Sequence, residues 1–102
     1  MIKLNILNDM TIFDQISVRI IKEQELIIGP IAWSEANKVL GLKVIDQDKG
    51  DVTLEGDSKM VLDKLVAQYE KLFGQASTEA CKEAVQDLIV ELPQDQIPNS
   101  LK

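Results

Sequence analysis

Histidine is absent from this sequence of 102 residues, and cysteine and tryptophan each occur once, as Cys81 and Trp33. Without histidine, the chain has no Ser-His-Asp or Cys-His pair, no imidazole metal ligand and no side chain whose ordinary pKa lies near neutrality. A single cysteine cannot form a disulfide within the chain or build a zinc or iron–sulfur site with other cysteines. We therefore expect no cofactor, no metal site and no enzyme of these common classes.

Glycine is also scarce, and the five glycines are isolated at positions 29, 41, 50, 56 and 74. Neither a phosphate-binding loop nor a dinucleotide fingerprint can be assembled from glycines at such spacing. The chemistry that remains for catalysis is that of carboxylate, lysine, tyrosine and hydroxyl groups. The tertiary fold brings such residues together, so an active site built from them has no recognisable motif in the sequence.

Long hydrophobic runs are missing as well. Apolar runs such as residues 26–28 are far shorter than the ~18 residues that a membrane span requires. The first residues lack the basic stretch and long apolar stretch of a secretion signal. Together with the lone cysteine, these features predict a cytoplasmic protein without a membrane partner.

Basic residues are sparse: the sequence has eleven lysine and arginine residues and seventeen acidic residues, and its formal net charge is −6. Arg19 is the only arginine, and the lysines are scattered. A nucleic-acid-binding protein needs a concentrated basic face to neutralise phosphates, so nucleic acid is not an expected partner.

Apolar residues make up 45% of the chain, which is typical of a globular domain. Residues 2–7 alternate between apolar and polar side chains and predict a strand. Thr11 followed by Asp14 predicts a capping box at the start of a helix that runs to Gly29. Residues 16–20 also alternate like a strand, but the helix formers at 22–26 favour a helix. The predicted inward face of this helix consists of Phe13, Ile16, Ile20 and Ile27, with Ile12, Ile21 and Ile28 beside it.

Gly29 and Pro30 predict the end of that helix and the start of a short one. The apolar stripe of the short helix comprises Ala32, Ala36, Val39 and Leu40. Residues 42–55 predict a β-hairpin with a polar loop from Asp46 to Asp51.

Asp57 is the predicted N-cap of the clearest helix, which ends at Gly74. Its apolar positions repeat at spacings of three and four: Val61, Leu62, Leu65, Val66, Tyr69, Leu72 and Phe73. Ser77 or Thr78 is expected to cap the last helix, which Pro93 closes. The predicted buried stripe of that helix is Ala80, Cys81, Ala84, Val85, Leu88, Ile89 and Leu92.

We therefore predict a mainly helical α+β fold with four helices in two helical hairpins and a small antiparallel sheet. Residues 1–92 form one globular domain, and 93–102 form a C-terminal tail that either frays or docks. A 45-residue repeat relates Ile16 to Val61, Ile20 to Leu65 and Gly29 to Gly74, with a one-residue gap before Ser34 and Thr78. Two interpretations stay open: a duplication, or two helix pairs that obey the same period and capping rules.

Two features suggest chemistry and are better explained by structure. Cys81 lies on the inward stripe of the last helix, which favours a small buried hydrophobe over a reactive thiol. The loop from Asp46 to Asp51 places carboxylates at alternate positions, as a calcium loop does. Its sixth position is Asp51 instead of glycine and its twelfth is Asp57 instead of glutamate, so a polar hairpin loop is the better interpretation.

Four acidic residues recur every four positions in the last predicted helix: Glu79, Glu83, Asp87 and Glu91. This spacing makes them helical neighbours, so they form either a docking strip for a basic partner or a solvated face. Trp33 lies off the best stripe of its short helix. It is either an exposed anchor for a partner or a side chain packed inside the chain.

The lack of catalytic and cofactor signatures predicts a non-enzymatic protein-interaction or oligomerisation module, with self-association or a protein partner. The candidate partner-binding residues are Trp33, Glu79, Glu83, Asp87 and Glu91. The alternative is a small-ligand-binding or carboxylate-based enzymatic domain with a pocket between the helix pairs.

Overall fold

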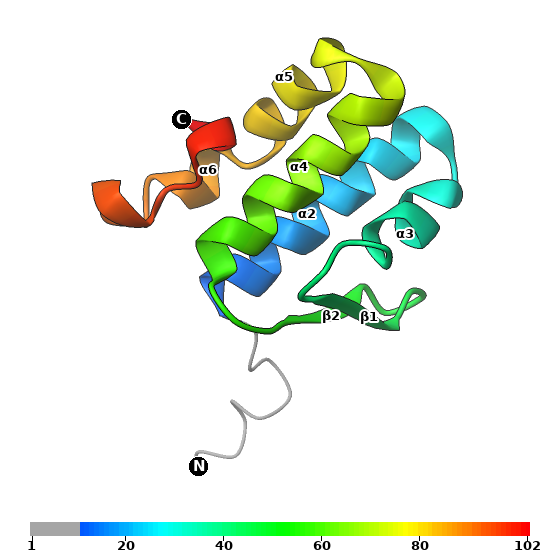
Figure 1. The fold of residues 1–102 in the computed structure, drawn as a ribbon, viewed down its shortest axis with the longest axis horizontal. Coiled ribbons are helices and arrows are strands. Elements are labelled where there is room, and N and C mark those ends of the chain that lie inside the picture. Colours follow the sequence, from blue (N-terminus) through cyan, green and yellow to red (C-terminus); the bar gives the residue numbers. More distant parts are fainter. Residues whose placement is uncertain (1–10) are drawn as a thin grey trace.

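The computed structural model describes residues 11–102 as a mainly helical α+β fold, which confirms the predicted class (Figure 1). The strand predicted at residues 2–7 lies outside the described residues. Two longer helices each precede a shorter one, and a hairpin lies between the two pairs. In chain order the elements are α2 (Ile12–Ile28), α3 (Ile31–Ala36), β1 (Leu42–Asp46), β2 (Asp51–Leu54), α4 (Ser58–Phe73), α5 (Gln75–Ala84) and α6 (Gln86–Ile89), followed by the 3-10 turns η1 (Gln94–Gln96) and η2 (Asn99–Leu101).

The start and end of α2 follow from its capping residues. The Thr11 hydroxyl accepts a hydrogen bond from the Asp14 amide at 3.0 Å, and the Asp14 carboxylate accepts one from the Thr11 amide at 3.2 Å. This is the predicted capping box, which satisfies amides that a helix start leaves unpaired. Gly29 ends the helix with a φ of 84°. Residues 16–20 are therefore helical, and the strand alternative is wrong.

The β-hairpin also forms as predicted. Leu42 pairs with Leu54 and Val44 with Val52 across an antiparallel register, and the pairing is irregular between Val44 and Asp46. The hairpin packs against α2 and α3. The polar loop closes it, since the Asp46 carboxylate accepts a hydrogen bond from the Lys49 amide at 3.2 Å.

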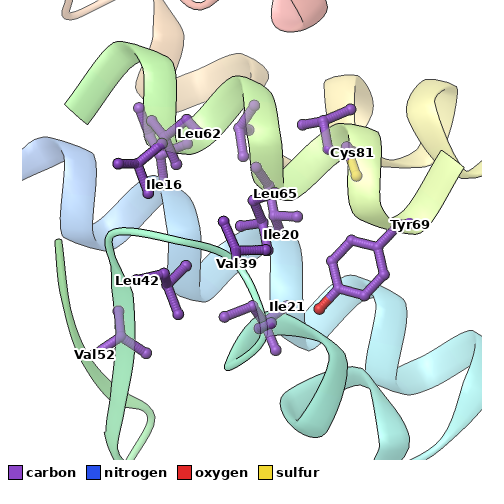
Figure 2. Close-up of a cluster of buried hydrophobic side chains, with 14 of the residues drawn as sticks. Ile16, Ile20, Ile21, Val39, Leu42, Val52, Leu62, Leu65, Tyr69 and Cys81 are labelled. Carbon is purple, nitrogen blue, oxygen red and sulfur yellow. The ribbon is translucent and has the colours of Figure 1, made fainter. Parts of the chain in front are cut away.

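Helix α4 begins at the predicted N-cap, where the Asp57 carboxylate accepts hydrogen bonds from the amides of Lys59 and Met60. It lies beside α2 and runs in the same direction, as Figure 1 shows. The apolar faces of both helices meet the hairpin and the shorter helices in one core (Figure 2). The larger fully buried members of this core are Ile16, Ile20, Ile21, Leu62, Leu65, Val66, Tyr69, Cys81 and Val85.

Four residues that were predicted to face the core are exposed instead: Ile27, Leu40, Leu72 and Phe73. Ile27, Leu72 and Phe73 lie in the last turns of α2 and α4. Leu40 follows the end of α3 at Ala36, where the backbone turns tighten and the helical period no longer applies.

The last predicted helix is divided. It begins at Gln75 directly after Gly74, without a cap from Ser77 or Thr78, and it breaks at Val85, whose φ and ψ are −115° and 9°. The Arg19 guanidinium donates a hydrogen bond to the Ala84 carbonyl oxygen at 3.0 Å. A long-range contact thus satisfies a carbonyl at the break, which local sequence rules could not foresee.

The two helix pairs contact each other reciprocally. The Gln24 amide of α2 donates to the Ser77 carbonyl of α5 at 3.2 Å, and the Tyr69 hydroxyl of α4 donates to the Ala32 carbonyl of α3 at 2.6 Å. Positions 24 and 69, and positions 32 and 77, are each 45 residues apart. These two contacts follow the 45-residue spacing, whereas α3 and α5 begin 44 residues apart, at Ile31 and Gln75. Duplication and shared helix rules both stay open as explanations of the repeat.

The C-terminal tail docks on the domain. Ile97, Pro98 and Leu101 are buried, and the Asp63 carboxylate of α4 accepts hydrogen bonds from the Ser100 amide and hydroxyl at 3.0 and 2.7 Å. Of the two alternatives for this segment, the structure shows docking.

Candidate functional site

Trp33 lies inside the domain. It is 2% exposed and belongs to the main core. Of the two interpretations of this residue, internal packing is the one that the structure shows. The expectation of an exposed anchor is wrong, because a buried ring offers no surface to a partner.

The four predicted acidic residues are all exposed but do not share one helix. The break at Val85 leaves Glu79 and Glu83 on α5 and Asp87 on α6, while Glu91 follows the end of α6. Two of the four have cationic neighbours. Asp87 lies 2.9 Å from Arg19, and Glu79 lies 4.0 Å from Lys82. The continuous docking strip is therefore absent from the described fold, and half of its charge is paired within the chain.

Cys81 is fully buried, in agreement with its predicted place in the core. Desolvation raises the pKa of its thiol to about 11, and the Gln24 amide lies 3.4 Å from its sulfur. A protonated thiol without access to solvent is a poor nucleophile. Across residues 11–102, no three carboxylate or thiol groups gather in a way that could hold a metal ion.

One end of the molecule carries exposed apolar side chains. Helices α2 and α4 end there, as Figure 1 shows. After each of them the backbone turns at a glycine, Gly29 or Gly74, into the next helix. The side chains involved are between 42% and 83% exposed. We call this group the apolar end, and it consists of Leu26, Ile27, Ile31, Leu72 and Phe73.

A second surface feature is a shallow cleft of about 300 Å³ between the segment that follows α3 and the outer face of α4. We call it the lysine cleft, because three of its seven lining residues are lysines. Its lining residues are Lys38, Val39, Leu40, Lys64, Ala67, Gln68 and Lys71.

Glu35 organises one side of the lysine cleft. Its side chain is only 9% exposed, and its two carboxylate oxygens contact Lys38 Nζ at 3.0 Å and Gln68 Nε2 at 2.8 Å. These hydrogen bonds, from Gln68 first and then Lys38, lower the pKa of Glu35. The carboxylate is therefore ionised near neutral pH and holds two lining residues in place.

The sequence indicates that the cleft residues of α4 share one face of that helix. Lys64, Ala67, Gln68 and Lys71 follow the spacing of one helical face. Lys38 carries no such signal, because only the tertiary fold brings it to α4. Sequence reasoning thus missed the cleft, although it had considered a pocket between the helix pairs.

The described surface has two further depressions. One, of about 420 Å³, is lined by residues from α5, α6 and the tail, and one of about 280 Å³ lies beside the hairpin. Among the lining residues of all three depressions there is one carboxylate, Glu55. None of these three depressions therefore brings two side-chain carboxylates together.

None of the helices within residues 11–102 has both the length and the apolar character needed to cross a membrane. Comparison of the chain with protein-family models, with curated proteins and with solved structures gives no match.

Proposed function

We propose that this chain is a non-enzymatic, cytoplasmic interaction module that self-associates through its apolar end. The observation that supports this proposal is that five large apolar side chains are exposed at the ends of α2 and α4 and the start of α3, which lie at one end of the molecule (Figure 1). Scattered exposed apolar residues are ordinary, whereas a group of them at one site is typical of an interface.

The energetics favour an association of moderate strength. Burial of apolar surface contributes about 25 cal/mol per Å², and association also costs translational and rotational freedom. A few half-exposed side chains on each copy therefore suit a weak, concentration-dependent dimer better than an obligate one.

A second copy is a suitable partner for two reasons. An apolar patch is complementary to itself, so one surface can serve both subunits around a two-fold axis. The net charge of −6 makes two copies repel each other at long range. Since salt screens that repulsion, self-association should strengthen as ionic strength rises.

Sedimentation equilibrium across micromolar to millimolar protein concentrations tests the proposal. We expect a monomer–dimer equilibrium, and we expect Ile27→Gln and Leu72→Gln each to weaken it by about tenfold, which is about 1.4 kcal/mol of lost burial. Val90→Gln is the matched control, because Val90 is 80% exposed but lies outside the apolar end. A chain that stays monomeric throughout, or a Val90 variant that weakens the dimer equally, would contradict the proposal.

A second candidate function, small-ligand binding, is favoured by one observation. The lysine cleft lies between the segment after α3 and helix α4, and hence between the two helix pairs. Its cationic lining gives no support to carboxylate-based catalysis.

A further inference from the structure

The lysine cleft concentrates positive charge on an otherwise acidic molecule. Lys38, Lys64 and Lys71 line it, and Glu35 is the carboxylate that touches its lining. Lys64 and Lys71 are exposed, and neither has a carboxylate within 4.0 Å in the part of the chain that the structure describes. Lys64 and Lys71 therefore line the cleft without an ion pair, and Lys71 lies near enough to Glu35 to interact with it electrostatically.

The spacing along α4 lets these two lysines serve one ligand. Lys64 and Lys71 are separated by two helical turns, or about 10 Å along the axis. Ala67 lies between them on the same face and has no side chain long enough to fill the space. Long flexible lysine stems can converge above such a small residue from either side.

Buried polar contacts hold the opposite wall in place. Glu35, whose side chain is more than nine-tenths buried, binds both Lys38 and Gln68. The Lys38 ammonium is thereby kept near the cleft while its side chain stays 64% exposed. The three lysines thus line the same cleft as the smaller or apolar side chains of Ala67, Val39 and Leu40.

We propose that the lysine cleft binds the phosphate group of a small phosphomonoester. A phosphate monoester carries about −1.5 to −2 charges at pH 7, which suits several converging ammonium groups better than a single carboxylate does. The apolar side chains of Val39 and Leu40 provide a surface for the organic part of the ligand. A volume of about 300 Å³ is at the lower end of the range for ligand sites and limits the ligand to a small molecule.

The acidic remainder of the protein argues against a polymeric anion. The formal net charge is −6, so an extended polyphosphate backbone would be repelled beyond the cleft. A compact ligand experiences mainly the local positive field. The lysine cleft and the apolar end share no residue, but Lys71 directly precedes Leu72, so the experiment separates ligand binding from self-association.

Amide NMR titration of the full chain tests the proposal with three probes at low salt: inorganic phosphate, phenyl phosphate and benzoate. We expect saturable shifts confined to residues 35–40 and 64–71. Phenyl phosphate should bind several-fold more tightly than inorganic phosphate, because its ring contacts Val39 and Leu40. Benzoate binding as tightly as phenyl phosphate would overturn the assignment to phosphate.

Charge-removing variants locate the site. We expect the double variant Lys64→Gln/Lys71→Gln to weaken phenyl phosphate binding at least tenfold while it keeps the dispersed spectrum of the folded protein. Lys49→Gln is the control, since Lys49 is exposed in the hairpin turn and does not line the cleft. Equal weakening by Lys49→Gln, or shifts spread over lysines elsewhere, would show non-specific ion binding only and overturn the proposal.

Two further experiments complete the test: a titration of a variant with weakened self-association and a competition with an oligonucleotide. The titration is repeated in Leu72→Gln, so that loss of self-association is separated from loss of ligand binding. A short single-stranded oligonucleotide is added as a competitor. If it bound the cleft more tightly than phenyl phosphate, the assignment to a small ligand would be wrong.

Discussion

The Tyr69 hydroxyl donates a hydrogen bond to the Ala32 carbonyl oxygen at 2.6 Å, and so ties α4 to the short helix of the other pair. Gln24 makes the reciprocal contact to Ser77 at 3.2 Å. The two contacts differ in quality. The Gln24 amide oxygen is buried without a hydrogen-bond partner among the described residues.

This difference predicts unequal costs for removing the two contacts. Tyr69→Phe should lower the free energy of unfolding by about 1–2 kcal/mol, because it removes a donor from a buried carbonyl. Gln24→Met should cost less, because it also removes a buried oxygen that has no partner. Urea unfolding of both variants measures the difference. A Gln24→Met variant that is the less stable of the two would contradict this ranking.

Gly41 is expected to tolerate no side chain. Its φ is 94°, and a Cβ there would lie 2.7 Å from Val61 Cγ2 and 3.0 Å from the Glu55 carbonyl oxygen. Gly41→Ala should therefore destabilise the fold by about 2–4 kcal/mol, from left-handed backbone strain plus the steric clash. Gly56→Ala is the control, because Gly56 has a φ of 84° but no atom within 4 Å of such a Cβ. Thermal unfolding should show the smaller loss, about 1 kcal/mol, for Gly56→Ala.

Cys81 should make stability depend on alkaline pH. Burial raises the pKa of its thiol from 9.0 to about 11. The unfolded chain therefore releases this proton from about pH 9 upward, while the folded chain keeps it until about pH 11. The contribution is complete below pH 9 and is lost as pH rises through this interval.

Chemical unfolding at pH 8 and pH 10.5 tests this dependence. The wild type should lose about 2 kcal/mol more than Cys81→Ala does between the two values. Comparison within each protein removes the constant cost of the cavity that alanine leaves. A parallel decline in both proteins would exclude a role for the thiol.

The tail should detach when its hydrogen bonds to α4 are removed. Asp63 accepts two hydrogen bonds from Ser100, so Asp63→Ala should accelerate hydrogen exchange at residues 97–101 about tenfold. Ser100→Ala keeps the bond from its own backbone amide and should have a smaller effect. Mass spectrometry of peptides from this segment measures both. Unchanged exchange in Asp63→Ala would mean that Ile97, Pro98 and Leu101 hold the tail without this contact.

Much of the fold could be read from local rules. The Thr11 capping box, the Asp57 N-cap and the hairpin register are each set by residues within a few positions of one another. Two of the wrong predictions concern places where distant residues decide. Arg19 contacts Ala84 at the break in the last helix, and the packing of the helix pairs leaves Ile27 and Leu72 outside the core.

The candidate sites also depend on contacts between residues that are distant in the sequence. The acidic positions 79, 83, 87 and 91 share a face only if one helix continues through them, and the break at Val85 removes that condition. Trp33 could be placed inside or outside only by the elements that cover it. The lysine cleft required Lys38 to meet α4, which no local pattern indicates.

By itself, the sequence determined the segments from α2 to α4, the caps of α2 and α4 and the exclusion of histidine-based chemistry, because capping and periodicity act over one or two turns. The tertiary structure alone decided which helix ends stay exposed, where the last helix breaks and which lysines share a cleft. Those outcomes depend on contacts between residues far apart in the chain, whose free energies arise only once the helix pairs have packed together.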